Sequence, residues 1–146
     1  MRVRVLALVG TVVLAGCFAR PAPDAATPIT SDQLVGTWIS AQDGGTITFR
    51  SDGTFTGTSL LNQIFDEQHR AGQPRDGSGT WRLTPSIDVS GGPLIRVELR
   101  FRTLTGEPLG FGTEMRSERQ DDQTVLAFYI GDPDQHHRYV FTKQPN

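Results

Sequence analysis

Residues 94–102 alternate apolar and charged side chains, and this alternation constrains the fold more than any other feature of the chain. Ile95, Val97, Leu99 and Phe101 fall on one face, whereas three arginines and a glutamate fall on the other. A period of two is typical of a strand with one buried side and one solvent-facing side. A chain built from such strands has to bury their apolar faces against one another.

Shorter segments with the same period follow one another along the chain and are separated by turn residues. Ile47 and Phe49 alternate with threonines, and Asp52-Gly53 is a strong hairpin signal because tight hairpin turns need a positive φ. Polar loops are expected at residues 71–78, 85–93 and 106–110. About eight short antiparallel strands in this order predict an all-β, up-and-down barrel, with a β-sandwich as the alternative.

Residues 59–69 break the alternation. Their apolar side chains recur at helical spacing, which predicts one short amphipathic helix inserted between the strands: Leu60, Leu61, Ile64 and Phe65. This helix is expected to close one end of the β core or, alternatively, to act as a mobile lid over a ligand cavity.

The N-terminus resembles an export signal that ends in a bacterial lipobox, Leu14-Ala15-Gly16-Cys17. Arg2 and Arg4 precede an apolar run that is too short for a transmembrane helix. The resemblance implies cleavage after residue 16 and attachment of a diacylglyceryl group to the Cys17 thiol. Two or three acyl chains hold a protein stably on a bilayer. We therefore expect an exported protein anchored to the outer face of the cell membrane, or to the outer membrane in a Gram-negative host.

The rest of the chain divides into a tether and one domain. Residues 17–31 carry the cysteine and three prolines without apolar periodicity, which predicts a flexible spacer. A helical turn capped by Ser31 or Asp32 opens the domain, which covers residues 32–146. Cys17 is the one cysteine in the sequence, so the domain has no disulfide and no thiol nucleophile.

Charge and motifs argue against several classes of function. The sequence has 14 basic and 16 acidic residues, and removal of Arg2 and Arg4 with the signal peptide leaves 12 basic residues. Nucleic-acid binding needs a basic surface, so no such partner is expected. The sequence has no Gly-x-Ser-x-Gly elbow and no phosphate-binding loop. We expect no catalytic activity and no cofactor, with an envelope hydrolase that uses His69 or residues 132–137 as an alternative.

The densest polar cluster is Asp132-Pro133-Asp134-Gln135-His136-His137. Its first three residues match a type I turn. Adjacent histidines in a strand point to opposite faces, so His136 and His137 do not easily share one ion. The sequence therefore predicts a turn here and no metal site.

Two Gly-Thr-Trp triplets, at residues 36–38 and 79–81, each open an expected strand. Leu34-Val35-Gly36-Thr37-Trp38, followed by Asp52-Gly53-Thr54-Phe55, resembles the opening of lipocalin-like (calycin-type) domains in bacteria. Residues 34–143 also resemble small lipoproteins of GC-rich bacteria. The resemblance implies a barrel whose floor is closed by Trp38, and it carries over no ligand.

The function expected from these features is non-enzymatic binding of a small apolar ligand inside the barrel or of an envelope partner on its loops. Thr113 and Ser117 alternate with outward Glu114, Arg116 and Glu118, so they would line a partly polar interior. The candidate ligand-binding residues are Trp38, Trp81, Ile64, Phe65, Thr113, Met115 and Ser117. The alternative is a structural or inhibitor-like protein without a pocket, and an interior cavity of roughly 300 Å³ or more would favour a ligand.

Overall fold

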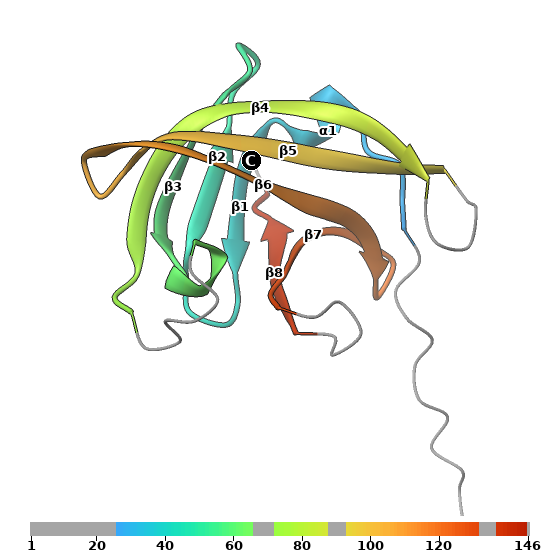
Figure 1. Cartoon of the computed structure of the whole chain (residues 1–146). Helices are drawn as coiled ribbons and strands as arrows, with labels where there is room; N and C mark the ends of the chain where they lie inside the picture. The colour runs from blue at the N-terminus through green and yellow to red at the C-terminus, as the bar shows by residue number, and fades with distance from the viewer. Residues whose placement is uncertain (1–25, 66–71, 88–92, 132–136, 146) are drawn as a thin grey trace, which may run out of the picture.

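A computed structural model describes residues 26–65, 72–87, 93–131 and 137–145. It shows an all-β fold in which eight antiparallel strands close into one up-and-down barrel (Figure 1). Each strand pairs with its neighbours in sequence, and the last strand pairs with the first. The strands are β1 (Gly36–Ser40), β2 (Thr46–Phe49), β3 (Thr54–Leu60), β4 (Arg75–Ile87), β5 (Pro93–Leu104), β6 (Glu107–Gln120), β7 (Gln123–Tyr129) and β8 (Arg138–Lys143). The predicted barrel is confirmed, and the sandwich alternative is wrong.

The hairpin turn between β2 and β3 lies where Asp52-Gly53 predicts it. Gly53 has a φ of 80° and its amide donates to the Arg50 carbonyl at 3.1 Å, which closes the turn between β2 and β3. Asp121 and Asp122 join β6 to β7 with φ values of 47° and 63°. Asp tolerates this left-handed conformation better than most residues, which suits it to tight hairpins.

The three strands β4, β5 and β6 are longer than predicted, and they arch together over one side of the barrel (Figure 1). β4 begins at Arg75, inside a stretch expected to be a loop, because its glycines let backbones and rings approach closely. A Cβ on Gly79 would lie 2.0 Å from the Arg100 carbonyl oxygen, and one on Gly77 would lie 2.7 Å from the Phe101 ring. The loop predictions at 71–78, 85–93 and 106–110 are therefore wrong where β4 and β6 replace them.

The predicted inserted helix at residues 59–69 is present in the described part as a single short turn, and it starts later than predicted. Ser59 and Leu60 end β3, and a single 3-10 turn, η1, follows at Asn62–Ile64. Leu60 pairs with Arg75 of β4 and is buried as a strand residue. Residues 66–71, including His69, lie outside the described residues.

The short helix α1 (Ser31–Leu34) is confirmed, but its cap lies one residue earlier than predicted. The Thr30 hydroxyl accepts from the Gln33 amide at 3.3 Å, and the Gln33 side chain accepts from the Thr30 amide at 2.9 Å. This capping box fixes the direction in which the chain enters the barrel. Leu34, at the end of α1, is buried in the core.

The prediction of a flexible tether is wrong for its last residues, because residues 26–30 pack on the barrel. β5 and β6 pair only as far as Arg96 and Arg116, which leaves the β5-facing edge of β6 open beyond that point. The Thr27 amide donates to the Ser117 carbonyl at 2.9 Å, and Ala26 bridges to Glu118. Ile29 then enters the core with 4% of its surface exposed. We call residues 26–30 the N-terminal strap.

Candidate functional site

The predicted ligand-binding residues converge on the interior of the barrel, as the alternation indicates. Trp38, Met115 and Ser117 are fully buried, and Ile64 is also in the core. Trp81, Phe65 and Thr113 are partly buried. The structure therefore brings these residues together around one interior, and their role in ligand binding stays a prediction.

Aromatic rings occupy the space where a ligand was expected. The Phe101 ring lies 4.9 Å from Phe55, 5.0 Å from Phe65 and 6.2 Å from Phe111, measured between ring centroids. On the other side of the barrel, the Tyr139 ring lies 4.6 Å from Phe141. Rings at these distances are in contact. The described side chains that point inward pack against one another, as in a filled core.

A buried aromatic side chain is hydrogen-bonded at each end of the barrel. At the end that carries α1, the indole nitrogen of Trp38 donates to the Leu34 carbonyl at 2.8 Å. At the other end, the Tyr139 hydroxyl donates to the Asp43 carboxylate of the β1–β2 turn at 2.7 Å. Burial and this hydrogen bond both raise the pKa of Tyr139. Each end is thus pinned by a buried aromatic side chain.

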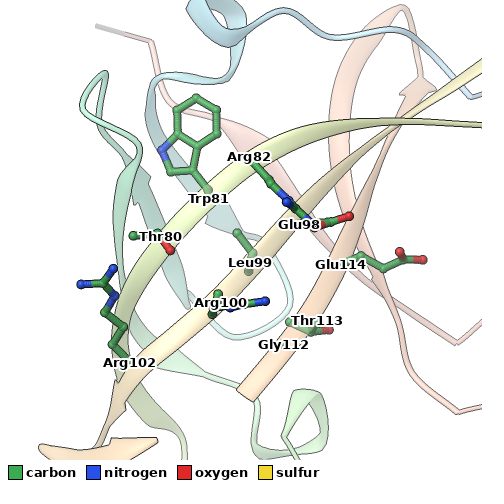
Figure 2. Close-up of a pocket in the computed structure, with 10 residues that line it drawn as sticks. All are labelled: Thr80, Trp81, Arg82, Glu98, Leu99, Arg100, Arg102, Gly112, Thr113 and Glu114. Atoms are coloured by element: carbon green, nitrogen blue, oxygen red, sulfur yellow. The ribbon is translucent and has the colours of Figure 1, made fainter. Parts of the chain in front are cut away.

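A concave surface lies across β4, β5 and β6, and we call it the β4–β6 groove (Figure 2). Its volume is about 640 Å³, which is in the range of small-molecule sites. It is lined by Thr80, Trp81, Arg82, Glu98, Leu99, Arg100, Arg102, Gly112, Thr113 and Glu114. Of the residues proposed from the sequence as a binding site, only Trp81 and Thr113 border it.

Two ion pairs organise one side of this groove. Arg82 of β4 contacts Glu98 of β5 at 2.5 Å, and the two side chains reach toward each other in Figure 2. Arg96 contacts Glu114 of β6 at 2.9 Å. The hydrogen bond from Arg82, followed by one from Thr84, lowers the pKa of Glu98 below its usual value. Both carboxylates are therefore already engaged by arginines.

Arg100 and Arg102 differ from these two arginines. Both are exposed, and neither side chain makes a hydrogen bond or a close ion pair within the described part of the chain. Arg100 lies between Thr80 and Gly112 in the strand register. A Cβ on Gly112 would meet only the Leu99 carbonyl, at 3.9 Å, so the surface next to Arg100 is open.

A second polar cluster, on the outer wall of β6, β7 and β8, is built differently. Glu118 is 2% exposed, accepts from the Tyr129 hydroxyl and pairs with Arg138 at 2.6 Å. The Arg116 guanidinium lies 4.6 Å from the centre of the Tyr129 ring. Burial, followed by the bond to Glu118, raises the pKa of Tyr129 to about 12. Because its groups interact with one another, this cluster is a structural network that covers β7, whose residues Val125–Phe128 are buried on both faces.

Several sequence predictions fall outside the described residues. Cys17 and the export signal are among them, as are residues 132–136 of the predicted turn, whereas His137 is described and exposed. Within the described ranges, no group of three histidine, cysteine or acidic residues is arranged to hold a metal ion. None of the helices described has the length and apolar character needed to cross a membrane.

The sequence predicts on which face the groove residues of β5 lie, but not which residues of β4 and β6 lie beside them. The alternation of residues 94–102 already places Arg96, Glu98, Arg100 and Arg102 on the outer face. What it does not show is the register that sets Arg100 opposite Gly112. That register depends on a bulge between Phe101 and Thr103 and on the turn at Thr105-Gly106.

Comparison with known proteins adds nothing to this geometry. A scan against models of protein families, a search of curated proteins and a search of solved structures each gave no match to this chain.

Proposed function

We propose that this chain is a non-enzymatic, lipid-anchored binding domain of the bacterial cell envelope, which recognises an envelope partner with the outer surface of its barrel. Cys17 carries the anchor, and the β4–β6 groove is the centre of the recognition surface. The anchor rests on the lipobox resemblance, with its charged start, apolar run, small residues and cysteine.

The observation that carries the choice of the outer surface is the filled interior. A barrel that holds a ligand usually leaves room between its inward side chains. Here Phe101 contacts three other rings, and Trp38 and Tyr139 are hydrogen-bonded at opposite ends. The groove, in contrast, presents charged groups that are accessible from outside.

Native mass spectrometry of the full chain, purified in neutral detergent from its own host, tests this proposal. We expect the mass of the chain from Cys17 onward plus covalent acyl chains, with no retained apolar molecule. A stoichiometric noncovalent lipid or other apolar compound would overturn outer-surface recognition and return the function to an interior ligand.

The anchor is tested separately with Cys17→Ala. Because no second thiol exists in the sequence, the variant should leave the membrane fraction and lose labelling by a fatty-acid probe. A Cys17→Ala variant that stays membrane-bound and labelled would refute the anchor. Loss of Cys17→Ala from the membrane fraction, together with the absence of a retained apolar ligand in the full chain, supports both parts of the proposal.

A further inference from the structure

The β4–β6 groove is positively charged, whereas the whole chain is negatively charged. The chain has a formal net charge of −2. Among the residues that line the groove, however, three arginines stand against two glutamates: Arg82, Arg100 and Arg102 against Glu98 and Glu114. A positive site on an acidic protein attracts anions locally while the rest of the surface repels them.

The two glutamates neutralise only part of this charge. They are bound by Arg82 and Arg96, and Arg100 adds only a weaker electrostatic attraction to Glu98, so neither Arg100 nor Arg102 has a carboxylate as a close partner. Two exposed like charges on one strand are unfavourable in the absence of a counter-charge. A guanidinium offers a planar fork of donors that matches carboxylate and phosphate oxygens.

The surroundings of Arg100 leave room for such an oxyanion. Gly112 has no side chain to cover the neighbouring strand, and the Thr80 hydroxyl on the other side makes no hydrogen bond within the described ranges. Thr80 can therefore donate to an anion that Arg100 holds. From these groups we infer that the β4–β6 groove binds an anionic polymer, with separate oxyanions held by Arg100 and by Arg102.

A polymer fits better than a single ion because the two guanidinium groups diverge. Figure 2 shows the Arg100 side chain directed toward the side of Glu114 and the Arg102 side chain directed away from it. They cannot both grip one phosphate in this arrangement, but they can hold two groups of a chain that crosses the strands. The open surface beside Gly112 can accommodate a narrow polymer, whereas a flat bilayer could not enter the groove there.

This inference rests on the proposed function, since it names the chemistry of the partner at the same groove. Phosphate and carboxylate share the chemistry that arginine recognises, so the test carries one probe of each kind. Fluorescently labelled polyphosphate and poly-glutamate are titrated with the full chain in neutral detergent at low ionic strength, and binding is followed by anisotropy. Inorganic phosphate and anionic phospholipid vesicles serve as further probes.

The test variant is R100Q/R102Q, and the matched control is R75Q/R119Q. Arg75 and Arg119 are exposed arginines outside the groove, so both variants lose the same charge. We expect at least one polymer to bind, with affinity reduced tenfold or more by R100Q/R102Q and less than twofold by R75Q/R119Q. Binding should weaken as salt is added, because exposed charges are screened. The polymer that binds more tightly identifies the oxyanion.

Three results would overturn the inference. They are the absence of binding by both polymers, an equal loss in the two variants, and vesicle binding that depends on Arg100 and Arg102 without polymer binding. Circular dichroism melts of both variants show whether the fold is retained. If the polymer test fails while the anchor is confirmed and no interior ligand is found, the proposed surface recognition stands with a different partner. An interior ligand found by mass spectrometry would instead remove the proposed function itself.

Discussion

Trp38 offers a quantitative test of the closed barrel. Its side chain is 1% exposed, its indole nitrogen donates to the Leu34 carbonyl at 2.8 Å, and the Lys143 ammonium lies 5.8 Å from its ring. Truncating a buried Trp to Ala costs about 3–5 kcal/mol through lost burial and the cavity that remains. The lost hydrogen bond adds about 1 kcal/mol. Trp38→Ala should therefore remove about 4–6 kcal/mol of a total stability of about 5–15 kcal/mol.

Trp81 provides the comparison, because it is only partly buried. It packs edge-on against Phe49 with centroids 6.0 Å apart, and its indole nitrogen donates to the Arg50 carbonyl at 3.0 Å. With less surface to lose, Trp81→Ala should cost about half as much, roughly 2–3 kcal/mol. Trp38→Phe retains much of the ring and should cost roughly 1–3 kcal/mol, mainly through the hydrogen bond and a smaller cavity.

The assay is urea unfolding of a soluble chain that begins at Phe18, followed by circular dichroism. This chain keeps every described residue, including the N-terminal strap. With a slope of about 1–3 kcal/mol per molar urea, Trp38→Ala should lower the midpoint by at least about 1 M or unfold the chain without urea. An unchanged midpoint for Trp38→Ala, or a larger loss for Trp81→Ala than for Trp38→Ala, would refute the assignment of Trp38 to the core.

Three further measurements address other parts of the fold. Ile29→Ala should cost about 2–4 kcal/mol in the same assay, because Ile29 is buried in the core. Glu118→Gln should cost about 3 kcal/mol, because Arg138 then loses the charge that it pairs with at 2.6 Å. Both tyrosines should ionise above their usual pKa of 10, Tyr129 near 12, because burial and a carboxylate partner favour the neutral hydroxyl. The raised pKa values stabilise the fold fully below pH 10, and this contribution is lost as pH rises from 10 through 12.

The controls follow from the same contacts. Ile87→Ala is the matched control, because Ile87 is 74% exposed and its truncation should leave the midpoint nearly unchanged; a similar cost for both changes would contradict a specific role for Ile29. A double-mutant cycle with Arg138→Gln should show coupling with Glu118→Gln, and strict additivity would contradict the ion pair. The sequence has two tyrosines, so absorbance at 295 nm reports both. Ionisation of either one at pH 10 in the folded chain would refute its buried hydrogen bond.

The strands were predictable because the local alternation of apolar and polar residues marks each of them. Inward residues such as Val97 and Leu99 alternate with charges, and Asp52-Gly53 marks a turn through its own backbone preference. The inserted helix starts later than predicted because Leu60 and Ile64 are four residues apart, a spacing that places side chains on one face in a helix and also in a strand. Pairing of Leu60 with Arg75 decided between the two, and that contact is not local in sequence.

The N-terminal strap and the groove were missed for a related reason. Ile29 is a single apolar residue beside prolines, so no periodicity marks it, and its burial depends on the edge of β6 that β5 leaves open. Gly112 gives no signal of its own either. It matters only because the register places it opposite Arg100. Such features come from the arrangement of distant segments, which local patterns do not specify.

The described packing at both ends makes binding inside the barrel costly. A ligand that entered past Leu34 and Trp38 at the α1 end, or past Tyr139 and Asp43 at the other end, would have to break the hydrogen bond there. Each opening exposes buried aromatic surface, at a cost of about 25 cal/mol per Å². A ligand bound inside would have to offset that cost in addition to displacing rings already in contact. A partner at the β4–β6 groove meets no such barrier, since Arg100 and Arg102 are already exposed. Recognition on the outer wall therefore needs no opening of the fold, which favours the groove over the interior as the working surface.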